Sequence, residues 1–211
     1  MHKGLRKRLI DELREKEIKD ENVLDAMNRI PRHFFLDPAF ERIAYEDRAF
    51  PIAAGQTISQ PYTVAYQTQF LQVQKFDKIL EIGTGSAYQA CVLAELGAWV
   101  YTIERQRKLF EHNNNFFFLK KYSRLKRFYG DGFEGLPSYA PFDKVIITAA
   151  APFVPPKLIA QLKVGGIMVI PVDNEDGSMQ QMKRIVKTAE GYEEQVLDNF
   201  SFVPMLGGRE R

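Results

Sequence analysis

Cysteine and histidine are scarce in this sequence of 211 residues. The single cysteine, Cys91, has no partner for an intramolecular disulfide, so the fold needs no oxidising compartment and we expect a cytoplasmic protein. The three histidines, His2, His33 and His112, form no H-x-x-x-H pair, and there is no C-x-x-C pair, so we expect no metal site. A G-x-S-x-G turn is also absent, which argues against a serine hydrolase.

The sequence also lacks a strong excess of charge and a long hydrophobic run. Its 29 Lys and Arg residues and 27 Asp and Glu residues leave a formal net charge of +2, too little to indicate a nucleic acid or a membrane surface as partner. The basic N-terminus is followed by the charged segment DELREKE, which is unlike a signal peptide. The longest apolar run, at residues 145–154, is far shorter than the roughly 20 residues that span a bilayer. We therefore expect no nucleic-acid partner and no membrane segment.

Two helices and an irregular segment are predicted at the N-terminus. Leucines at every fourth position predict a helix over residues 5–18. A second helix is expected to begin after Asp20, a suitable N-cap, and to end near Ile30 because a proline follows. Residues 32–61 mix aromatic side chains with prolines and predict irregular chain pinned by buried rings. We predict that residues 1–61 form an N-terminal helical cap with a ligand loop.

The remaining residues, 62–211, are predicted to form the core of one α/β domain. Short apolar runs alternate there with helical segments, which is typical of βαβ units around a parallel sheet. We expect one helix that Ser86 caps and Gly97 ends, and another between Pro155 and Gly165. The predicted fold is a doubly wound, mostly parallel Rossmann-like sheet with a C-terminal β-hairpin. The predicted strands cover residues 78–82, 99–103, 124–130, 144–148, 166–172, 179–188 and 193–203.

The segment LEIGTGSA at residues 80–87 combines a strand end with a glycine-rich turn that opens a helix. Gly83 and Gly85 would let the backbone approach a ligand closely, and the start of the following helix presents free N–H groups. Glu104 ends the next strand about twenty residues later, where a carboxylate can bind ribose hydroxyls. The sequence therefore predicts a nucleotide-cofactor site here.

Two residues near this turn favour S-adenosylmethionine over NAD. Dinucleotide enzymes have a third glycine where this sequence has Tyr88. Glu81 would place negative charge beside a pyrophosphate, which is unfavourable, but it would attract a cofactor with ammonium and sulfonium charges.

Two further loops could contact a ligand. The polar segment GQTISQP at residues 55–61 could close over a ligand, although composition alone equally favours an ordinary solvated turn. Asp131, between two glycines after a predicted strand, could accept a hydrogen bond from an adenine amino group, although such a tripeptide is more typical of a turn.

Seven segments resemble the protein-L-isoaspartate O-methyltransferase family, in the same order, from about Ile30 to Gly207. They are GQTISQPY, LEIGTGSAYQA, VYTIER, GDG, APFDKVIITAAAPFVP, QLKVGGIMVIPV and FVPMLGG. TISQP is the specific segment, because many S-adenosylmethionine-dependent methyltransferases share the glycine turn and the acidic strand end. The resemblance implies methyl transfer from S-adenosylmethionine to the α-carboxyl of L-isoaspartyl residues in damaged peptides and proteins. The ester can collapse to a succinimide and reopen partly as aspartyl, which initiates repair.

The resemblance also implies a Rossmann-like methyltransferase fold and a set of site residues. Ser59 would be the catalytic or substrate-positioning hydroxyl. The residues implied for S-adenosylmethionine are Thr57, Ile58 and Gln60 in the loop, Glu81, Gly83, Gly85 and Ser86 around the methionine part, Glu104 at the ribose, and Asp131 with Gly132 at the adenine. The residues implied for the peptide are Thr148 and Ala149 at a strand end, and Val203 and Leu206 in a strand over residues 203–206. We expect a monomer that acts on isoaspartyl-containing peptides and proteins.

The sequence departs from the family at Ala87, where GTGSG usually has its last glycine. Alanine is acceptable wherever φ is negative, so we expect Ala87 to leave the cofactor site unimpaired.

Three other functions fit the same sequence less well. A small-molecule methyltransferase would keep the cofactor but would not explain the TISQP and VPMLGG segments. An NAD-dependent oxidoreductase conflicts with Tyr88. A non-catalytic module would retain the fold alone. Methyl-transfer assays on isoaspartyl and aspartyl peptides, and melting temperatures with each cofactor, would distinguish these alternatives.

Overall fold

A twisted sheet of seven strands forms the centre of the protein, in the order β5-β4-β3-β6-β7-β8-β9. The computed structural model describes residues 2–174 and 177–210. The first five strands in this order, β5, β4, β3, β6 and β7, are parallel, and β8 and β9 are antiparallel to their neighbours. The predicted fold class is therefore confirmed. The strands are β3 (Lys78–Ile82), β4 (Trp99–Glu104), β5 (Leu125–Tyr129), β6 (Phe142–Ile147), β7 (Leu162–Asp173), β8 (Gln180–Lys187) and β9 (Tyr192–Phe200).

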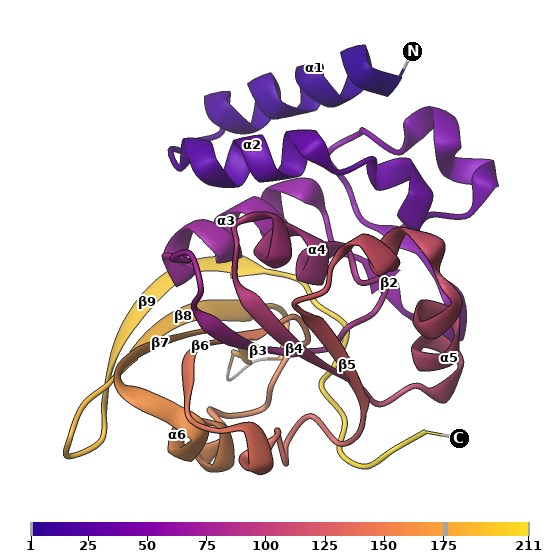
Figure 1. The fold of residues 1–211 in the computed structure, drawn as a ribbon. Helices are drawn as coiled ribbons and strands as arrows, with labels where there is room; N and C mark the ends of the chain where they lie inside the picture. Colours follow the sequence, from indigo (N-terminus) through magenta and orange to yellow (C-terminus); the bar gives the residue numbers. More distant parts are fainter. Residues whose placement is uncertain (1, 175–176, 211) are drawn as a thin grey trace.

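The inner parallel strands β4, β3 and β6 are buried on both faces, because their apolar side chains point alternately to two separate cores. In β3, Ile79 belongs to the core under helices α3 (Pro61–Leu71) and α4 (Tyr88–Glu95), and Leu80 belongs to the core on the opposite face. Helix α6 (Pro156–Gln161) covers that second face, and α5 (Arg107–Asn115) lies beside β4 and β5 (Figure 1).

Helix α3 was not predicted, although it joins the cap to the core. The predicted boundary after residue 61 falls at its start, where Pro61 occupies the first turn, a position that proline suits. The helix lies between the sheet and the cap, and eight of its residues are buried, including polar ones such as Gln67 and Thr68. A helix buried on nearly all sides has no amphipathic stripe, so its sequence gives no periodic pattern.

The cap is built from two helices and short turns. Helix α1 (His2–Glu15) packs on α2 (Glu21–Arg29), and α2 packs on α3 and α4, so the two helices form an outer layer (Figure 1). Asp20 caps α2 as predicted and accepts hydrogen bonds from the backbone of Asn22 and Val23. The predicted irregular segment contains the 3₁₀ turns η1 (Arg32–Phe35), η2 (Pro38–Ile43) and η3 (Ala53–Gly55), and a short pairing of β1 (Phe50–Pro51) with β2 (Thr57–Ile58).

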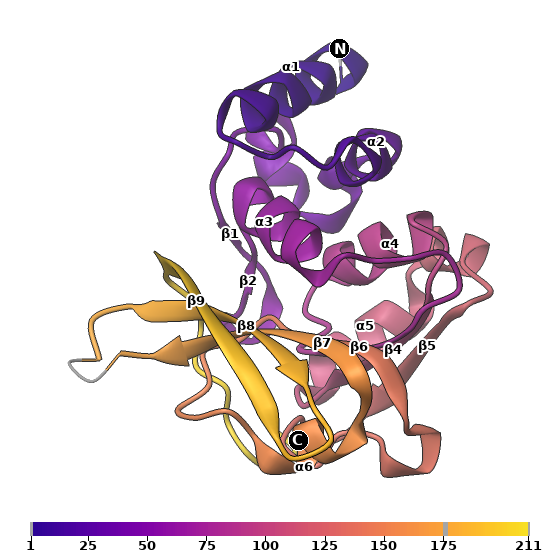
Figure 2. The same ribbon diagram turned by 90° about the vertical axis from the view of Figure 1, so that its left-hand side faces the viewer.

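The C-terminal hairpin of β8 and β9 extends one edge of the sheet, as predicted (Figure 2). The predicted end of one helix and one predicted strand were wrong. Helix α6 stops at Gln161, and Gly165, expected to close it, lies inside β7. Residues 203–206 form no strand, and Pro204 makes only a single bridge to Ala150. No helix in the residues that the structure describes is long and apolar enough to cross a membrane.

Candidate active site

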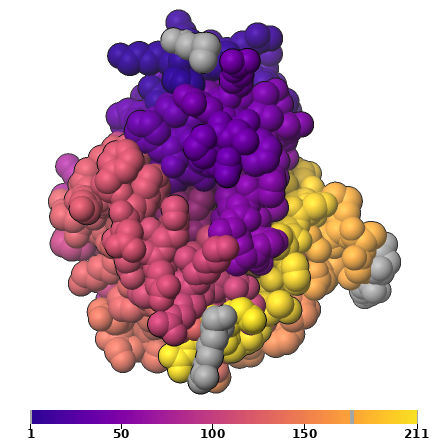
Figure 3. Space-filling view, turned by 90° about the vertical axis from the view of Figure 1, so that its right-hand side faces the viewer, coloured from indigo at the N-terminus to yellow at the C-terminus, as the bar shows by residue number. Residues whose placement is uncertain are grey.

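A cleft of about 920 Å³, including the part open to solvent, lies at the carboxyl ends of β3 and β4. This is where ligands bind to open α/β sheets. The loop before α3 and the C-terminal segment complete its walls, and these purple and yellow parts of the chain meet on the face shown in Figure 3. Twelve of the predicted site residues line the cleft: Thr57, Ile58, Ser59, Gly83, Gly85, Ser86, Glu104, Gly132, Thr148, Ala149, Val203 and Leu206.

The glycine turn after β3 requires glycine at its first position. Gly83 has φ of 94°, and an added Cβ atom would lie 2.8 Å from the Thr148 hydroxyl oxygen. That hydroxyl donates to the carbonyls of Ile82 and Gly83, at 3.0 and 2.8 Å, and thereby joins the end of β3 to the end of β6. Asn113 of α5 donates to the Gly85 carbonyl at 2.9 Å. The turn is thus held on both sides.

The expectation for Ala87 rested on a negative φ, and that premise was wrong. Ala87 has φ of 67° and is itself the N-cap of α4, where Ser86 was expected. The Ser86 hydroxyl accepts a hydrogen bond from the Tyr88 backbone, at 3.3 Å, and so still supports the helix start. The left-handed conformation costs a non-glycine residue about 1–2 kcal/mol. Ala87 is therefore strained, whatever its effect on the cofactor.

Ala87→Gly is expected to lower the free energy of unfolding by about 1–2 kcal/mol less than Ala90→Gly does. Both alanines are fully buried, so each substitution removes one buried methyl group and adds backbone entropy to the unfolded chain. Only Ala87→Gly also relieves a left-handed conformation, because Ala90 lies in the interior of α4. Urea denaturation of both variants measures the difference. Equal losses in the two variants would contradict the strain assigned to Ala87.

Glu104 presents a carboxylate to the cleft at the end of β4. Its two oxygens accept hydrogen bonds from the backbone N–H groups of Gly85 and Gln106, both at 2.8 Å. Burial raises the pKa of Glu104, and these backbone donors oppose the rise. Each carboxylate oxygen has a second lone pair, so the group can still accept hydrogen bonds from a ligand.

The Ser59 hydroxyl is available to a ligand. Ser59 lines the cleft, and within residues 2–174 and 177–210 no group forms a hydrogen bond with its hydroxyl. Its backbone is fixed, because the Ser59 carbonyl accepts a hydrogen bond from the Arg32 guanidinium at 2.9 Å. Ser59 therefore lines the cleft on an anchored loop, with its hydroxyl free to bind a ligand.

The C-terminal segment forms the wall beyond β6. The Val203 carbonyl accepts from the Ala150 backbone at 2.7 Å, and the Met205 backbone donates to Ala150 at 2.6 Å. Further along, Arg105 donates to the carbonyls of Gly207 and Gly208, both at 3.3 Å. The segment is thus tied to both sides of the cleft.

Three predicted site residues do not line the cleft. Gln60 turns its amide to the Asp47 carboxylate, at 3.1 Å. Asp131 accepts from the backbone of Phe133 at 2.9 Å and of Gly208 at 2.6 Å, so it holds the C-terminal segment. Glu81 points to the core beneath α4 and is fully buried.

The Glu81 carboxyl is buried with little compensation, because Thr102 is nearby but forms no hydrogen bond of good geometry with it. Neither of its carboxylate oxygens has a hydrogen-bond partner in the described part of the chain. Burial raises the pKa of Glu81 to about 8; the Thr102 hydroxyl opposes this rise, and the charge of Glu104 adds to it. A neutral carboxylic acid is therefore expected at this position at pH 7.

The buried Glu81 carboxyl predicts a pH dependence of stability. In the folded protein Glu81 keeps its proton up to a pH of about 8, whereas in the unfolded chain it loses the proton near pH 4.3. The free energy of unfolding that depends on this group therefore falls as pH rises between these values. Glu81→Gln should therefore gain stability relative to the wild type by up to about 1.4 kcal/mol per pH unit in that window. Urea denaturation from pH 5 to 8 measures the difference. Parallel curves for the two proteins would contradict the prediction.

Several residues of the cleft were not predicted. Tyr88 and Gln89 follow the glycine turn, and Arg105 and Gln106 follow Glu104, so their position next to the recognised motifs could have revealed them. Gln56 precedes the predicted loop residues and also lines the cleft.

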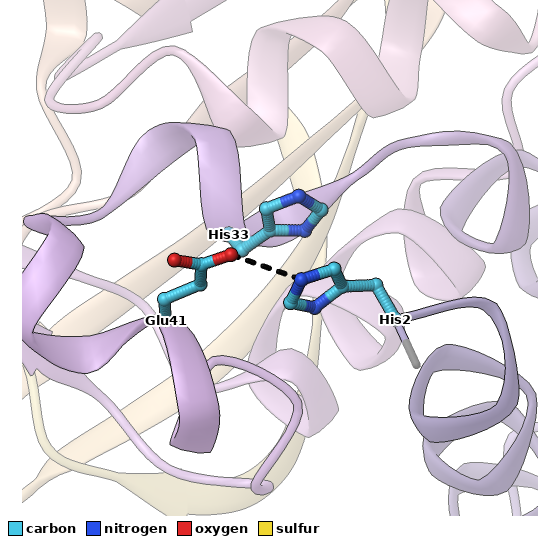
Figure 4. Close-up of side chains that lie close together, drawn as sticks. All are labelled: His2, His33 and Glu41. Carbon is cyan, nitrogen blue, oxygen red and sulfur yellow. Dashed lines mark ion pairs between the residues drawn. The ribbon is translucent and has the colours of Figure 1, made fainter.

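A second group of titratable side chains lies in the cap (Figure 4). His2 pairs with Glu41, with 2.9 Å between Nε2 and Oε1, and its ring stacks on His33 at a centroid distance of 4.1 Å and an interplanar angle of 16°. Nitrogen lone pairs lie in the ring plane, so stacked rings do not converge on one ion at about 2.1 Å. His33 Nδ1 is also 2.7 Å from the Tyr45 hydroxyl. We interpret the group as a contact that ties α1 to the turns η1 and η2 within the cap.

Comparisons with known proteins agree with this architecture. Residues 4–210 match the family described as protein-L-isoaspartate(D-aspartate) O-methyltransferase. A protein-L-isoaspartate O-methyltransferase of Flavobacterium johnsoniae is 52% identical over 205 residues, which cover 97% of this chain and 95% of the relative. One of Cytophaga hutchinsonii is 51% identical over 208 residues, covering 98% and 93%.

Two solved structures share the fold. A protein-L-isoaspartate O-methyltransferase superimposes with a TM-score of 0.86 at 25% identity, covering 96% of this chain, which spans 66% of that longer protein. A Plasmodium falciparum protein described as a putative member, in complex with S-adenosyl-L-homocysteine, gives a TM-score of 0.82 at 22% identity, covering 97% and 98%. With its sequence matched from residue 4 to residue 210, the chain belongs to the protein-L-isoaspartate(D-aspartate) O-methyltransferase family.

Proposed function

We propose that this cleft is the active site in which the chain transfers a methyl group from S-adenosylmethionine to the α-carboxyl of L-isoaspartyl residues, thereby initiating the repair of damaged peptides and proteins. Family membership supports this reaction. One observation supports the assignment to this cleft: Ser59, the glycine turn and Glu104 line it together.

The cleft suits S-adenosylmethionine, which supplies a methyl group on a positively charged sulfonium when bound. The Glu104 carboxylate can accept hydrogen bonds from ribose hydroxyls, and two backbone N–H groups already fix its orientation. Gly83 and Gly85 leave room for the methionine part, and Gly132 lines the cleft near the proposed adenine position. Glu81 does not reach the cleft, so we propose that it contacts no cofactor and affects the site only by its packing in the core behind the turn.

The acceptor needs no general base. A carboxyl group with an ordinary pKa near 4 is already an anionic nucleophile at neutral pH. Ser59 would therefore donate a hydrogen bond that orients the carboxylate, and it need not remove a proton. The remaining acceleration would come from fixed orientation and from exclusion of water by the loop and the C-terminal segment.

The peptide would enter beside the ends of β6 and the C-terminal segment. Thr148, Ala149, Val203 and Leu206 border the cleft there, and Leu206 is half exposed, so it can contact a peptide chain. We further propose that the enzyme works as a monomer in the cytoplasm on isoaspartyl-containing peptides and proteins, without a nucleic-acid partner.

Methyl transfer to matched peptides tests the proposal. Purified protein is given S-adenosylmethionine labelled in its methyl group and one of two peptides that differ only in an isoaspartyl or an aspartyl residue. We expect base-labile label in the isoaspartyl peptide alone. Equal labelling of both peptides would show that the acceptor is wrong, and no labelling of either would contradict the reaction itself.

A further inference from the structure

Arg32 is a fully buried cation without a carboxylate partner in the described part of the chain. It belongs to η1 of the cap, yet its Nη2 atom donates to the carbonyl of Ser59 at 2.9 Å, and more weakly to that of Arg48 at 3.4 Å. Its Nε and Nη1 atoms have no hydrogen-bond partner among the described residues. The strongest contact of this buried charge is therefore with the backbone of the loop that carries Ser59.

The same guanidinium also touches the other side of the cleft. Its central carbon lies 5.0 Å from the centroid of the Tyr88 ring, which stabilises a cation. Tyr88 opens α4 directly after the glycine turn and lines the cleft. Arg32 thus links the cap to the Ser59 loop and to the proposed cofactor side, while it does not itself line the cleft.

Packing alone does not account for this arginine. An unpaired buried charge is costly, and an apolar side chain of similar volume often stabilises such a position at least as well. Burial lowers the pKa of Arg32 to about 10, while the negative charge of Asp47 opposes the fall, so the guanidinium remains charged at neutral pH. A costly buried cation directly behind the loop proposed to receive a carboxylate indicates a role in function.

The residues after Ser59 are anchored separately. Asp47, which is buried, accepts from the Gln60 side chain at 3.1 Å and from the Tyr62 backbone at 2.7 Å. Lys16, directly after α1, pairs with the same carboxylate at 2.9 Å. Because Asp47 holds only Gln60 and the start of α3, the hydrogen bond from Arg32 is the side-chain contact that fixes Ser59 itself.

We propose that Arg32 is a positioning residue for methyl transfer, which holds Ser59 so that its hydroxyl faces the acceptor carboxylate. The inference rests on the proposed role of Ser59. Loss of the guanidinium would let the Ser59 peptide unit rotate while Asp47 keeps the rest of the loop in place. The cofactor site, built on β3, β4 and α4, would remain.

A double-mutant cycle tests this inference with the full-length protein. Arg32→Gln, Ser59→Ala and the double variant are compared with the wild type in kcat for an isoaspartyl peptide, Kd for S-adenosylhomocysteine and melting temperature. We expect Arg32→Gln to lower kcat about 10- to 30-fold and to change Kd less than threefold. In the Ser59→Ala background the same substitution should lower kcat less than threefold, because the hydroxyl that Arg32 positions is no longer present.

Two variants serve as controls. Arg29→Gln removes another cap arginine, one that pairs with Glu95 and does not touch the loop, and should leave kcat unchanged. Arg32→Lys keeps the charge without the planar fork. It is expected to fold and to recover part of the kcat lost in Arg32→Gln, and it replaces Arg32→Gln in the cycle if that variant does not fold.

The outcomes separate the two proposals. Equal kcat losses from the Arg32 substitution in both backgrounds, or a loss of cofactor affinity in step with kcat, would show a merely structural role. If kcat is unchanged in the Arg32 variant but lowered in Ser59→Ala, the positioning role of Arg32 is overturned and the proposed role of Ser59 stands. Unchanged kcat in Ser59→Ala would overturn the proposed role of Ser59 and the inference with it.

Discussion

Ser59→Ala is expected to lower kcat for an isoaspartyl peptide about 10- to 100-fold, not to abolish it. The carboxylate remains a nucleophile without the serine, so only its orientation is lost. Because the hydroxyl also stabilises the bound carboxylate before reaction, part of its binding energy does not appear in the rate. Steady-state kinetics, together with the Kd for S-adenosylhomocysteine, measure the effect, and we expect that Kd to change little.

Ser138→Ala is a matched control for this substitution. Ser138 lies in the exposed 3₁₀ turn η5 (Pro137–Tyr139), away from the cleft, and its loss should leave both constants unchanged. A Ser59→Ala enzyme with wild-type kcat and KM would remove Ser59 from the mechanism.

Glu104→Gln is expected to weaken the binding of S-adenosylhomocysteine about 10- to 100-fold. Hydrogen bonds to a charged group contribute about 1.5–3 kcal/mol each, and 1.4 kcal/mol corresponds to a tenfold change in Kd. The amide also has only one acceptor oxygen for the two backbone N–H groups that Glu104 now holds. Isothermal titration calorimetry measures the change.

Glu111→Gln provides the comparison for Glu104. This exposed glutamate of α5 pairs only with Arg107 in the described part of the chain and should not affect cofactor binding. Wild-type affinity in Glu104→Gln, with the fold intact, would show that the ribose does not bind at this carboxylate.

The sequence predicted the strands of the sheet well because the central strands β3, β4 and β6 contain short apolar runs between turn residues. It could not predict which face each side chain of such a strand takes, since both faces are buried and the apolar run does not alternate. Glu81 illustrates the difficulty: motif position suggested the cofactor, but its side chain lies on the face of Ile79, under α3 and α4. The motif therefore indicated a turn that does line the cleft, whereas the Glu81 carboxyl lies outside it.

Other residues were misplaced because tertiary contacts decide their direction. Gln60 and Asp131 carry polar groups suited to a cofactor, yet Asp47 and Gly208 engage them. The positive φ of Ala87 follows from how the turn joins β3 to α4, which local sequence does not encode for an alanine. Arg32 gave no periodic or motif signal, because its role depends on a loop 27 residues away.

A crystal structure with S-adenosylhomocysteine and an isoaspartyl peptide tests the central claim most directly, namely that one cleft brings the cofactor and the α-carboxylate together. We predict ribose hydroxyls at the Glu104 carboxylate and the isoaspartyl α-carboxylate within hydrogen-bonding distance of the Ser59 hydroxyl. A cofactor bound outside the cleft, or a peptide whose α-carboxylate lies away from Ser59, would contradict this claim.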